Sequence, residues 1–569
     1  MVQYEFFLAS SLEKVLPHRR PEALPPDTRL SGWRGQKAAV QLVYTAHNGA
    51  PNMPVQQYYA EITGAPGAVR MRPVELIPVN LPCYENSDDD YISKIPGLFP
   101  DLLAEPGEVL LLPLPRQYRS LWLTFDIPED AAAGDYEITV RTLPCRSKKQ
   151  PDGTVFRDID AENQIFELPF TLHVGKADLP PQSLLHTEWF HTDCLSTWYK
   201  VPVFSEEYWR ITENFIRAAA EHGVNMLLTP VFTPPIDTPV GKERPTVQLV
   251  DMALQGDTWQ FGFEKLERWV FLCQRNGITH LEMPHLFTQW GAVATPKIVA
   301  TVDGEEKRVF GWDVSAGSRK YRAFLEQFLS ALRRKLEELG YDNDHVYYHI
   351  SDEPSPEHMD AFHTALKQTA GLLDDCHVFD ALTNFEFYRT GLVKSPVVAN
   401  AFIQPFFDAH VPNLWVYYCC VQGDLVPNRF FAMPSYRNRI MGVLMYLYDT
   451  AGFLQWGFNF YNAKYSIHPI DPFRCADGDC GYPAGDPFLV YPGPEGQPLS
   501  SIRAEVQDDA LLDLRALRLL EHLAGRDFTT RLILETAKMD DLTFTDYPRN
   551  NEFLLTLRQR VAAEIDTRA

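Results

Sequence analysis

Two adjacent carboxylic acids, Asp352 and Glu353, follow a short apolar run that begins at Val346, and two prolines, Pro354 and Pro356, come after them. An apolar run of strand length that leads into acids and a Ser-x-Pro helix start is typical of the carboxyl end of a parallel strand. Repulsion between neighbouring acids in low-dielectric surroundings raises a carboxyl pKa. We therefore expect Glu353 to stay protonated near neutral pH beside an ionised Asp352. On a solvated surface the same dipeptide would only begin the next helix.

The elements around these acids predict a (β/α)8 barrel of the TIM type. Helical stripes over residues 207–222, 263–276 and 321–339 each end at a glycine, and a strand-like run follows each of them. Eight such runs close a barrel, and the ends of its strands carry the active site. The expected strands are Leu184–Glu188, Asn225–Thr229, Ile278–Met283, Val346–Asp352, Cys376–Asp380, Val397–Phe402, Leu414–Cys420 and Gly452–Phe458.

The rest of the chain predicts two further parts. Residues 1–176 contain short alternating runs separated by proline and glycine, which favours an antiparallel β-sandwich. Residues 177–500 then form the barrel domain, and residues 501–569 form a short helical extension. Its first helix, over residues 501–524, should pack on the outside of the barrel.

Composition excludes several classes of function. The 569 residues carry a formal charge of -23, which repels nucleic acid and anionic membranes. The first residues lack a secretory signal and no run is long enough to span a membrane, so we expect a cytoplasmic protein. Nine cysteines without C-x-x-C spacing favour free thiols. We expect neither metal nor cofactor, because no histidine accompanies the cysteine pairs at 419–420 and 475/480, and the acids at 88–90 lack further spaced ligands. The oligomeric state stays open.

The seventh predicted strand bears on the type of chemistry. In retaining glycosidases with an acid on strand 4, a carboxylate nucleophile is common on strand 7, yet residues 414–420 contain only aromatic, apolar and thiol side chains. Substrate-assisted hydrolysis needs no such nucleophile, because a 2-acetamido oxygen of the substrate attacks the anomeric carbon. One carboxylate then orients the amide and its neighbour protonates the leaving oxygen, which suits adjacent Asp352 and Glu353.

Several motifs spread over most of the chain resemble glycoside hydrolase family 123-like proteins, which are β-N-acetylgalactosaminidases together with a large uncharacterised group of relatives. The resemblance implies Glu353 as general acid and base, Asp352 as the carboxylate that orients the acetamido group, and Tyr417 as a donor to the acetamido oxygen. It also implies that Trp456 stacks on the sugar. The motifs are Pro100-Asp101-Leu-Leu, Leu121-Trp122-Leu-Thr-Phe-Asp-Ile-Pro128, Ala133-Gly134-Asp-Tyr136, Ser351-Asp352-Glu353-Pro354, Trp415-Val-Tyr417-Tyr-Cys-Cys420, Pro427-Asn428-Arg429-Phe430, Gly452-Phe453-Leu-Gln-Trp456-Gly457, Gly485-Asp486-Pro-Phe-Leu-Val-Tyr491-Pro492-Gly493 and Ser501-Ile502-Arg503.

Other polar and aromatic residues near predicted strand ends are candidates for substrate binding. A tryptophan beside polar groups suits a sugar, because its face contacts C–H bonds while the polar groups bind hydroxyls. A role in the core is equally open for the tryptophans, and His349, inside strand 4, is expected to be a packed core residue. The binding candidates are Trp189, His191, Glu282 and His285 after predicted strands, Asn428 and Trp456 from the family-like motifs, and Asn459 in a loop. Gln289 and Trp290 also follow the third predicted strand.

Three functions follow, and the first is favoured. It is the removal of β-linked N-acetylhexosamine, with N-acetylgalactosamine as the favoured sugar, from a carbohydrate or glycoconjugate by substrate-assisted retaining hydrolysis. The second is a direct retaining β-glycosidase in which Glu282 or another strand-end carboxylate is the nucleophile, for which a carboxyl separation of about 5 Å would be the sign. The third is a carbohydrate-binding barrel protein without turnover. The sequence leaves the C4 configuration of the sugar, the aglycone and exo or endo action undetermined.

Overall fold

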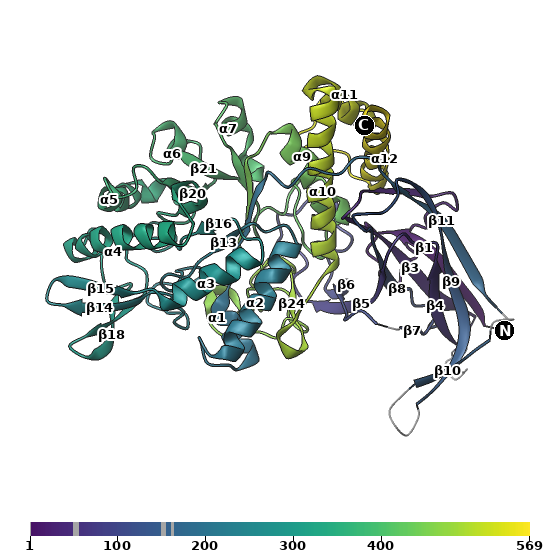
Figure 1. The fold of residues 1–569 in the computed structure, drawn as a ribbon, viewed down its shortest axis with the longest axis horizontal. Helices are drawn as coiled ribbons and strands as arrows, with labels where there is room; N and C mark the ends of the chain where they lie inside the picture. The colour runs from purple at the N-terminus through teal and green to yellow at the C-terminus, as the bar shows by residue number, and fades with distance from the viewer. Residues whose placement is uncertain (1, 49–55, 108, 150–154, 161–163) are drawn as a thin grey trace.

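The computed structural model describes residues 2–48, 56–107, 109–149, 155–160 and 164–569. Figure 1 shows two β-sheets at the amino-terminal side, a barrel surrounded by helices, and carboxyl-terminal helices that lie between the two. The prediction of a β-sandwich followed by a (β/α)8 barrel with a helical extension is confirmed.

The amino-terminal sandwich is built from two sheets that bury alternate side chains between them. Val40, Leu121 and Leu172 are fully buried in this core. Every described strand pair is antiparallel except β2 with β11, which is parallel. The first sheet has the order β1 (Gln3–Ser10), β3 (Lys37–His47), β8 (Arg119–Asp126), β5 (Val69–Val79) and β6 (Gly97–Leu103). The second has the order β2 (Arg29–Gly32), β11 (Phe166–Val174), β9 (Gly134–Lys149), β4 (Gln57–Thr63) and β7 (Leu110–Leu111), with β10 (Val155–Ile159) paired to β9.

The barrel contains all eight predicted strands in chain order. Neighbouring strands are parallel, and the pairing of β12 with β23 closes the ring. The strands are β12 (Leu185–Glu188), β13 (Met226–Leu228), β16 (His280–Glu282), β19 (Val346–Tyr348), β20 (His377–Leu382), β21 (Ser395–Ala399), β22 (Trp415–Tyr417) and β23 (Gly452–Gln455).

Strand β19 ends at Tyr348, whereas the sequence predicts a strand as far as Asp352. The backbone N–H groups of Ile350 and Ser351 donate to the side-chain Oδ1 of Asp380 at 2.9 and 3.3 Å, instead of to a backbone carbonyl of the neighbouring strand β20. The chain therefore leaves the sheet before the two acids and carries them above the ends of the strands.

Helices surround the barrel, and three of them match the predicted stripes: α2 (Glu206–Glu221), α3 (Glu264–Arg275) and α4 (Arg319–Glu338). The glycines that follow them, at positions 223, 277 and 340, have φ of 77°, 83° and 92°, in the left-handed region that glycine adopts without steric cost. The remaining barrel helices are short. They are α1 (Thr192–Tyr199), α5 (Met359–Thr369), α6 (Glu386–Arg389), α7 (Gln404–Asp408), α8 (Ser435–Arg439) and α9 (Met441–Leu447).

A small four-stranded sheet, which the sequence analysis did not predict, is inserted on one side of the barrel and packs on α4 (Figure 1). Two segments form it, one before α3 and one before α4. Its strands have the order β15 (Thr258–Gly262), β14 (Asp251–Gln255), β17 (Ile298–Val302) and β18 (Glu305–Phe310).

The carboxyl-terminal helices α10 (Ile502–Ala524), α11 (Arg526–Ala537) and α12 (Asn551–Arg568) join the barrel to the sandwich. Helix α10 contacts α8 and α9 of the barrel and also strand β6 of the sandwich. At its start, Arg503 forms a buried bidentate ion pair with Asp101 of β6, and the Tyr491 hydroxyl donates to the same carboxylate at 2.6 Å. These residues belong to the family-like motifs, which therefore mark the contact between the two parts. None of the described helices is long and apolar enough to cross a membrane.

Candidate active site

A pocket of about 260 Å³ opens at the carboxyl ends of the barrel strands. Residues that lie in or after seven of the eight strands line it, so side chains far apart in the sequence converge there. They are Trp189, Ile236, Asp237, Gln289, Trp290, Asp352, Glu353, Ala381, Tyr417, Cys419, Cys420, Leu454, Trp456, Lys464, Tyr465 and Tyr482.

The turn that carries Asp352 and Glu353 is strained. Glu353 has a φ of 42°, in the left-handed region that a side chain with a Cβ rarely adopts. The Ser351 hydroxyl donates to the carbonyl of Thr288 at 2.9 Å and the Trp290 N–H donates to the carbonyl of Asp352 at 3.3 Å, so the loop after β16 holds this turn. Strain of this kind persists where the surroundings over-determine it, and it is concentrated at functional sites.

Both carboxyl groups are biased towards protonation. Burial raises the pKa of Asp352, and the neighbouring Glu353 carboxylate raises it further. Burial also raises the pKa of Glu353, although the hydrogen bond that the Tyr417 hydroxyl donates to Glu353 Oε1 acts in the opposite direction. Gln289 Nε2 donates to Asp352 Oδ2 at 2.7 Å. The sequence predicts a raised pKa for Glu353 alone, whereas in the structure the pKa of both carboxyl groups is raised because both are buried away from bulk water.

Beneath the pocket, His349 bridges two buried carboxylates. Its Nε2 lies 2.6 Å from Glu282 Oε1 and its Nδ1 lies 3.4 Å from Asp380 Oδ1. The imidazole is stacked between the rings of His285 and Phe379, each with its centroid at 4.3 Å. Burial alone would lower the pKa of His349, but the hydrogen bonds and charges of the two carboxylates raise it to about 9. His349 is thus a core residue, as predicted, and it also places a positive charge below Asp352.

Glu282 is occupied by several donors at once. The Trp189 indole N–H donates to its Oε1 at 2.7 Å, beside the contact from His349, and the Thr187 hydroxyl donates to its Oε2. The side chain is fully buried and does not line the pocket. Glu282 therefore holds the ring of Trp189 in place, and that ring lines the pocket.

On the other side of the pocket, Trp456 is held at both ends. Its indole N–H donates to Asp486 Oδ2 at 2.8 Å, and its carbonyl accepts from His191 Nε2 at 2.8 Å. Burial raises the pKa of Asp486 to about 7 and lowers that of His191 well below its usual value. Arg244 Nη1 and Nη2 donate to His191 Nδ1 at 3.2 Å, so the neutral imidazole carries its proton on Nε2. The result is a fixed aromatic wall.

The predicted site residues separate into two groups. Asp352, Glu353, Tyr417, Trp189 and Trp456 line the pocket. The structure does not bring the other five to it, and all of them are buried behind its walls: Glu282, His191, His285, Asn428 and Asn459.

The asparagines among these five hold loops. Asn428 Nδ2 donates to the carbonyls of Cys419 and Gln422 at 2.9 and 3.0 Å, and thereby closes the turn after β22. Asn459 Oδ1 accepts from the His191 N–H at 2.8 Å. Asn428 was a candidate from its motif and Asn459 from its loop, and in the structure both side chains hold loops behind the pocket instead of facing a substrate.

Besides the apolar Ile236, Ala381 and Leu454, four polar lining residues were not predicted from the sequence: Asp237, Lys464, Tyr465 and Tyr482. Asp237 follows a strand, and a complete search of strand ends could have found it. The other three lie in the segment between β23 and α10, where no sequence pattern predicts which side chains face the pocket.

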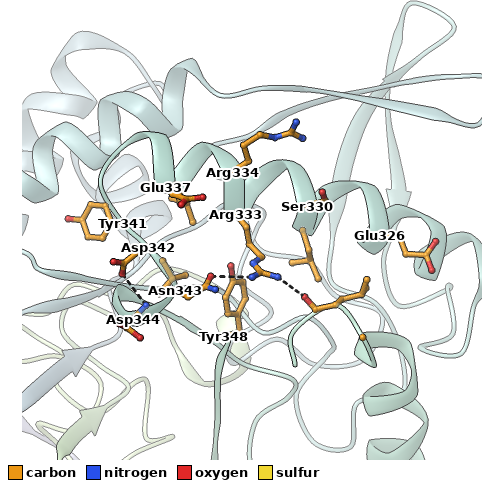
Figure 2. A pocket seen from close by; sticks show the side chains of 15 residues that line it. Glu326, Ser330, Arg333, Arg334, Glu337, Tyr341, Asp342, Asn343, Asp344 and Tyr348 are labelled. Carbon is orange, nitrogen blue, oxygen red and sulfur yellow. Dashed lines mark hydrogen bonds between the residues drawn. The ribbon is translucent and has the colours of Figure 1, made fainter. Parts of the chain in front are cut away.

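A second hollow, of about 510 Å³, lies at the opposite end of the barrel between α4 and the start of β19 (Figure 2). Arg333 extends across it and donates to Asn343 Oδ1 at 3.3 Å, to the Leu372 carbonyl at 3.2 Å and to Asp375. Its charge is already paired, and the hollow lies away from the carboxyl ends of the strands. Among the described residues, no group of three or more histidine, cysteine or acidic side chains could hold a metal ion.

The chain matches a known protein family. The model of the glycoside hydrolase 123 catalytic domain matches residues 189–520, more than half of the chain. The structure of a family 123 glycoside hydrolase from Clostridium perfringens, studied for glycolipid glycan hydrolysis, is similar with a TM-score of 0.71 at 14% identity. The match covers 99% of this chain and 98% of that one. At this identity the likeness concerns the fold alone.

Other similarities are weaker. An endo-1,4-β-D-xylanase 10B from Clostridium thermocellum has a TM-score of 0.31 at 9% identity, with 83% of this chain and 90% of that chain covered. A β-glucuronidase from Ruminococcus gnavus has a TM-score of 0.30 at 9% identity, with 84% and 89% covered. Both TM-scores are too low to indicate a shared fold. No curated protein matches the chain.

Proposed function

The chain belongs to glycoside hydrolase family 123 and is therefore a glycosidase that acts on carbohydrate, and we propose that it removes β-linked N-acetylhexosamine by substrate-assisted retaining hydrolysis. N-acetylgalactosamine is the sugar we favour. The observation that carries the proposal is the adjacent pair Asp352 and Glu353 in one pocket with Tyr417, a hydroxyl at the strand where a carboxylate nucleophile is common.

In the first step the acetamido oxygen of the substrate attacks the anomeric carbon, and the glycosidic bond breaks. Glu353 gives its proton to the leaving oxygen, so the aglycone departs neutral and Glu353 becomes a carboxylate. Asp352 accepts the amide N–H and stabilises the positive charge of the oxazolinium ion. The Gln289 donor and the His349 cation below it favour the ionised form of Asp352 that this role needs.

In the second step a water molecule attacks the anomeric carbon from the side that the aglycone left. Glu353 takes the proton of that water, the ring formed by the acetamido group opens, and the sugar leaves with its original configuration. The Tyr417 hydroxyl, which donates to Glu353 Oε1 in this structure, would donate to the acetamido oxygen when substrate is bound. Holding that oxygen close to the anomeric carbon can lower the barrier by several kcal/mol, up to about 7–11.

A direct retaining mechanism would require a second carboxylate that is free to attack. Glu282, the candidate from the sequence, accepts hydrogen bonds on both oxygens and does not line the pocket. This arrangement weighs against the alternative. A binding protein without turnover has no specific support, since both acids of the pair line the pocket.

A panel of aryl β-glycosides with and without a 2-acetamido group tests the proposal. We expect turnover of the N-acetylgalactosaminide, weaker turnover of the gluco epimer and negligible turnover of the 2-hydroxy sugars. A thiazoline mimic of the cyclised intermediate should inhibit far more tightly than the free sugar. Equal rates for 2-hydroxy and 2-acetamido sugars, or covalent trapping of Glu282 by a 2-fluoro sugar, would refute substrate assistance.

A further inference from the structure

The pocket contains a cation that has no anionic partner. Lys464 is the only lysine or arginine among the described residues that line it. Within the described part of the chain, no carboxylate oxygen lies within 4.0 Å of its ammonium group, and the ammonium donates to no carbonyl or side-chain oxygen. The nearby buried Arg244, by contrast, is paired in bidentate fashion with Asp193. An unpaired ammonium at a pocket wall is free to bind an anion from outside.

The position of Lys464 is nevertheless fixed. Its backbone N–H donates to the Gly478 carbonyl at 3.0 Å. A Cβ atom placed on Gly481 would lie 2.4 Å from the Cβ of Lys464, so the bare backbone of Gly481 packs directly against the base of the lysine side chain. The ammonium lies 5.4 Å from the ring centroid of Tyr465 and 5.6 Å from that of Tyr482. Aromatic faces attract a cation without using its hydrogen-bond donors.

Lys464 adjoins an aromatic rim at the mouth of the pocket. Trp290 and Tyr465 are 37% and 43% exposed, and their rings meet edge to face at 5.9 Å. Both have left-handed backbones, with φ of 54° and 64°, which bulky residues rarely adopt. Asp352 is only 7% exposed, so the rim lies on the solvent side of the reacting carboxyls. A leaving sugar would lie against this rim, because aromatic faces pack on its C–H bonds.

We propose that Lys464 binds an anionic substituent, a carboxylate or a sulfate ester, on the leaving sugar, and so selects glycans in which the N-acetylhexosamine is attached to a charged sugar. The inference rests on the proposed function and specifies its substrate. A charge-assisted hydrogen bond in a partly dehydrated site is stronger than one to a neutral hydroxyl. Burial raises the pKa of Asp237, which also lines the pocket, and the Ser466 N–H already donates to its carboxylate at 3.1 Å.

The test compares two matched pairs of disaccharides. In the first pair the same N-acetylhexosamine is linked to glucuronate or to glucose, and in the second it is linked to a sulfated or an unsulfated galactose. The two pairs distinguish the carboxylate from the sulfate. We expect the wild type to prefer the charged member of at least one pair by about 10–100-fold in kcat/KM, and salt to weaken that preference. Lys464→Met, which keeps the apolar stem, should bring the ratio near one, and Lys464→Arg should restore much of it. Lys394→Met, at an exposed lysine outside the pocket, should leave the ratio unchanged.

The outcomes separate the two proposals. If aryl N-acetylhexosaminides are hydrolysed but neither charged sugar is preferred, or if Lys464→Met lowers charged and neutral rates equally, the assignment of Lys464 is wrong while the proposed function stands. If no glycoside is hydrolysed, the proposed function fails, and calorimetric binding of the same disaccharide pairs decides on Lys464. Tighter binding of the charged member that Lys464→Met abolishes would support the assignment, and equal binding would overturn it.

Discussion

Replacing Tyr417 by phenylalanine removes one hydroxyl from the pocket and leaves the ring in place. That hydroxyl donates to Glu353 Oε1 and favours the ionised carboxylate. A hydrogen bond to a charged group is worth roughly 1.5–3 kcal/mol, and one pKa unit corresponds to about 1.36 kcal/mol. Glu353 is partly open to the pocket, and solvent weakens the bond, so the lower end applies. We expect Tyr417→Phe to raise the pKa of Glu353 by about one unit.

The assay is the pH dependence of kcat/KM on an aryl N-acetylhexosaminide. A general acid acts only while protonated, so the rate falls as pH rises through its pKa. In Tyr417→Phe this fall should move about one unit towards higher pH, and the maximum rate should also decrease, because the acetamido oxygen loses a donor.

Tyr418→Phe is the matched control for this experiment. Tyr418 is the next residue in the chain and is fully buried, and its hydroxyl has no hydrogen-bond partner among the described residues. Its removal should leave the pH profile in place. A profile that stays fixed in Tyr417→Phe, or moves to lower pH, would refute the assignment of the Tyr417 hydroxyl as a donor to the catalytic carboxylate.

Three further changes have expected outcomes. Glu353→Gln should slow substrates with poor leaving groups by roughly 10²–10⁴-fold and activated aryl glycosides by less, and an equal loss on both would remove Glu353 from the acid role. His349 has a folded-state pKa of about 9 against an unfolded value near 6.5, so its stabilisation is complete below about pH 6.5 and is lost as pH rises through 9. The difference in free energy of unfolding between wild type and His349→Gln should therefore shrink by about 3 kcal/mol over that window in chemical denaturation, and a difference independent of pH would contradict the raised pKa. Arg503→Met leaves Asp101 as a buried unpaired charge and should cost about 3–5 kcal/mol, whereas Arg503→Met with Asp101→Leu should recover much of that loss.

The sequence predicted the barrel because its strands are short apolar runs that recur between amphipathic helices. It did not predict the inserted sheet, because the signal there is weak. In β18, residues 305–308 are charged and exposed, and only Phe310 at its end is buried. A strand on the surface of a small sheet lacks the buried face from which alternation is recognised.

The candidate site was predictable only where chemistry and strand ends coincide. Asp352 and Glu353 are acids at the end of a strand, and that position suffices to select them. Lys464 lies in a long irregular segment, and its approach to the pocket depends on the Gly478 and Gly481 backbones, which no local pattern relates to the barrel. His349 was expected to be a core residue, but its charge depends on Glu282 and Asp380, which belong to other strands and meet it only in the folded barrel.

Because Glu353 has a left-handed backbone, selection for stability and selection for catalysis should favour different residues at this position. Glycine adopts this conformation without steric cost, while a residue with a Cβ loses roughly 1–2 kcal/mol there. A library at position 353 screened only for heat resistance should therefore enrich glycine and asparagine and discard the acid. A glutamate that is retained at this position would indicate selection for turnover. A relative with glycine there is expected to be more stable and to have no catalytic activity.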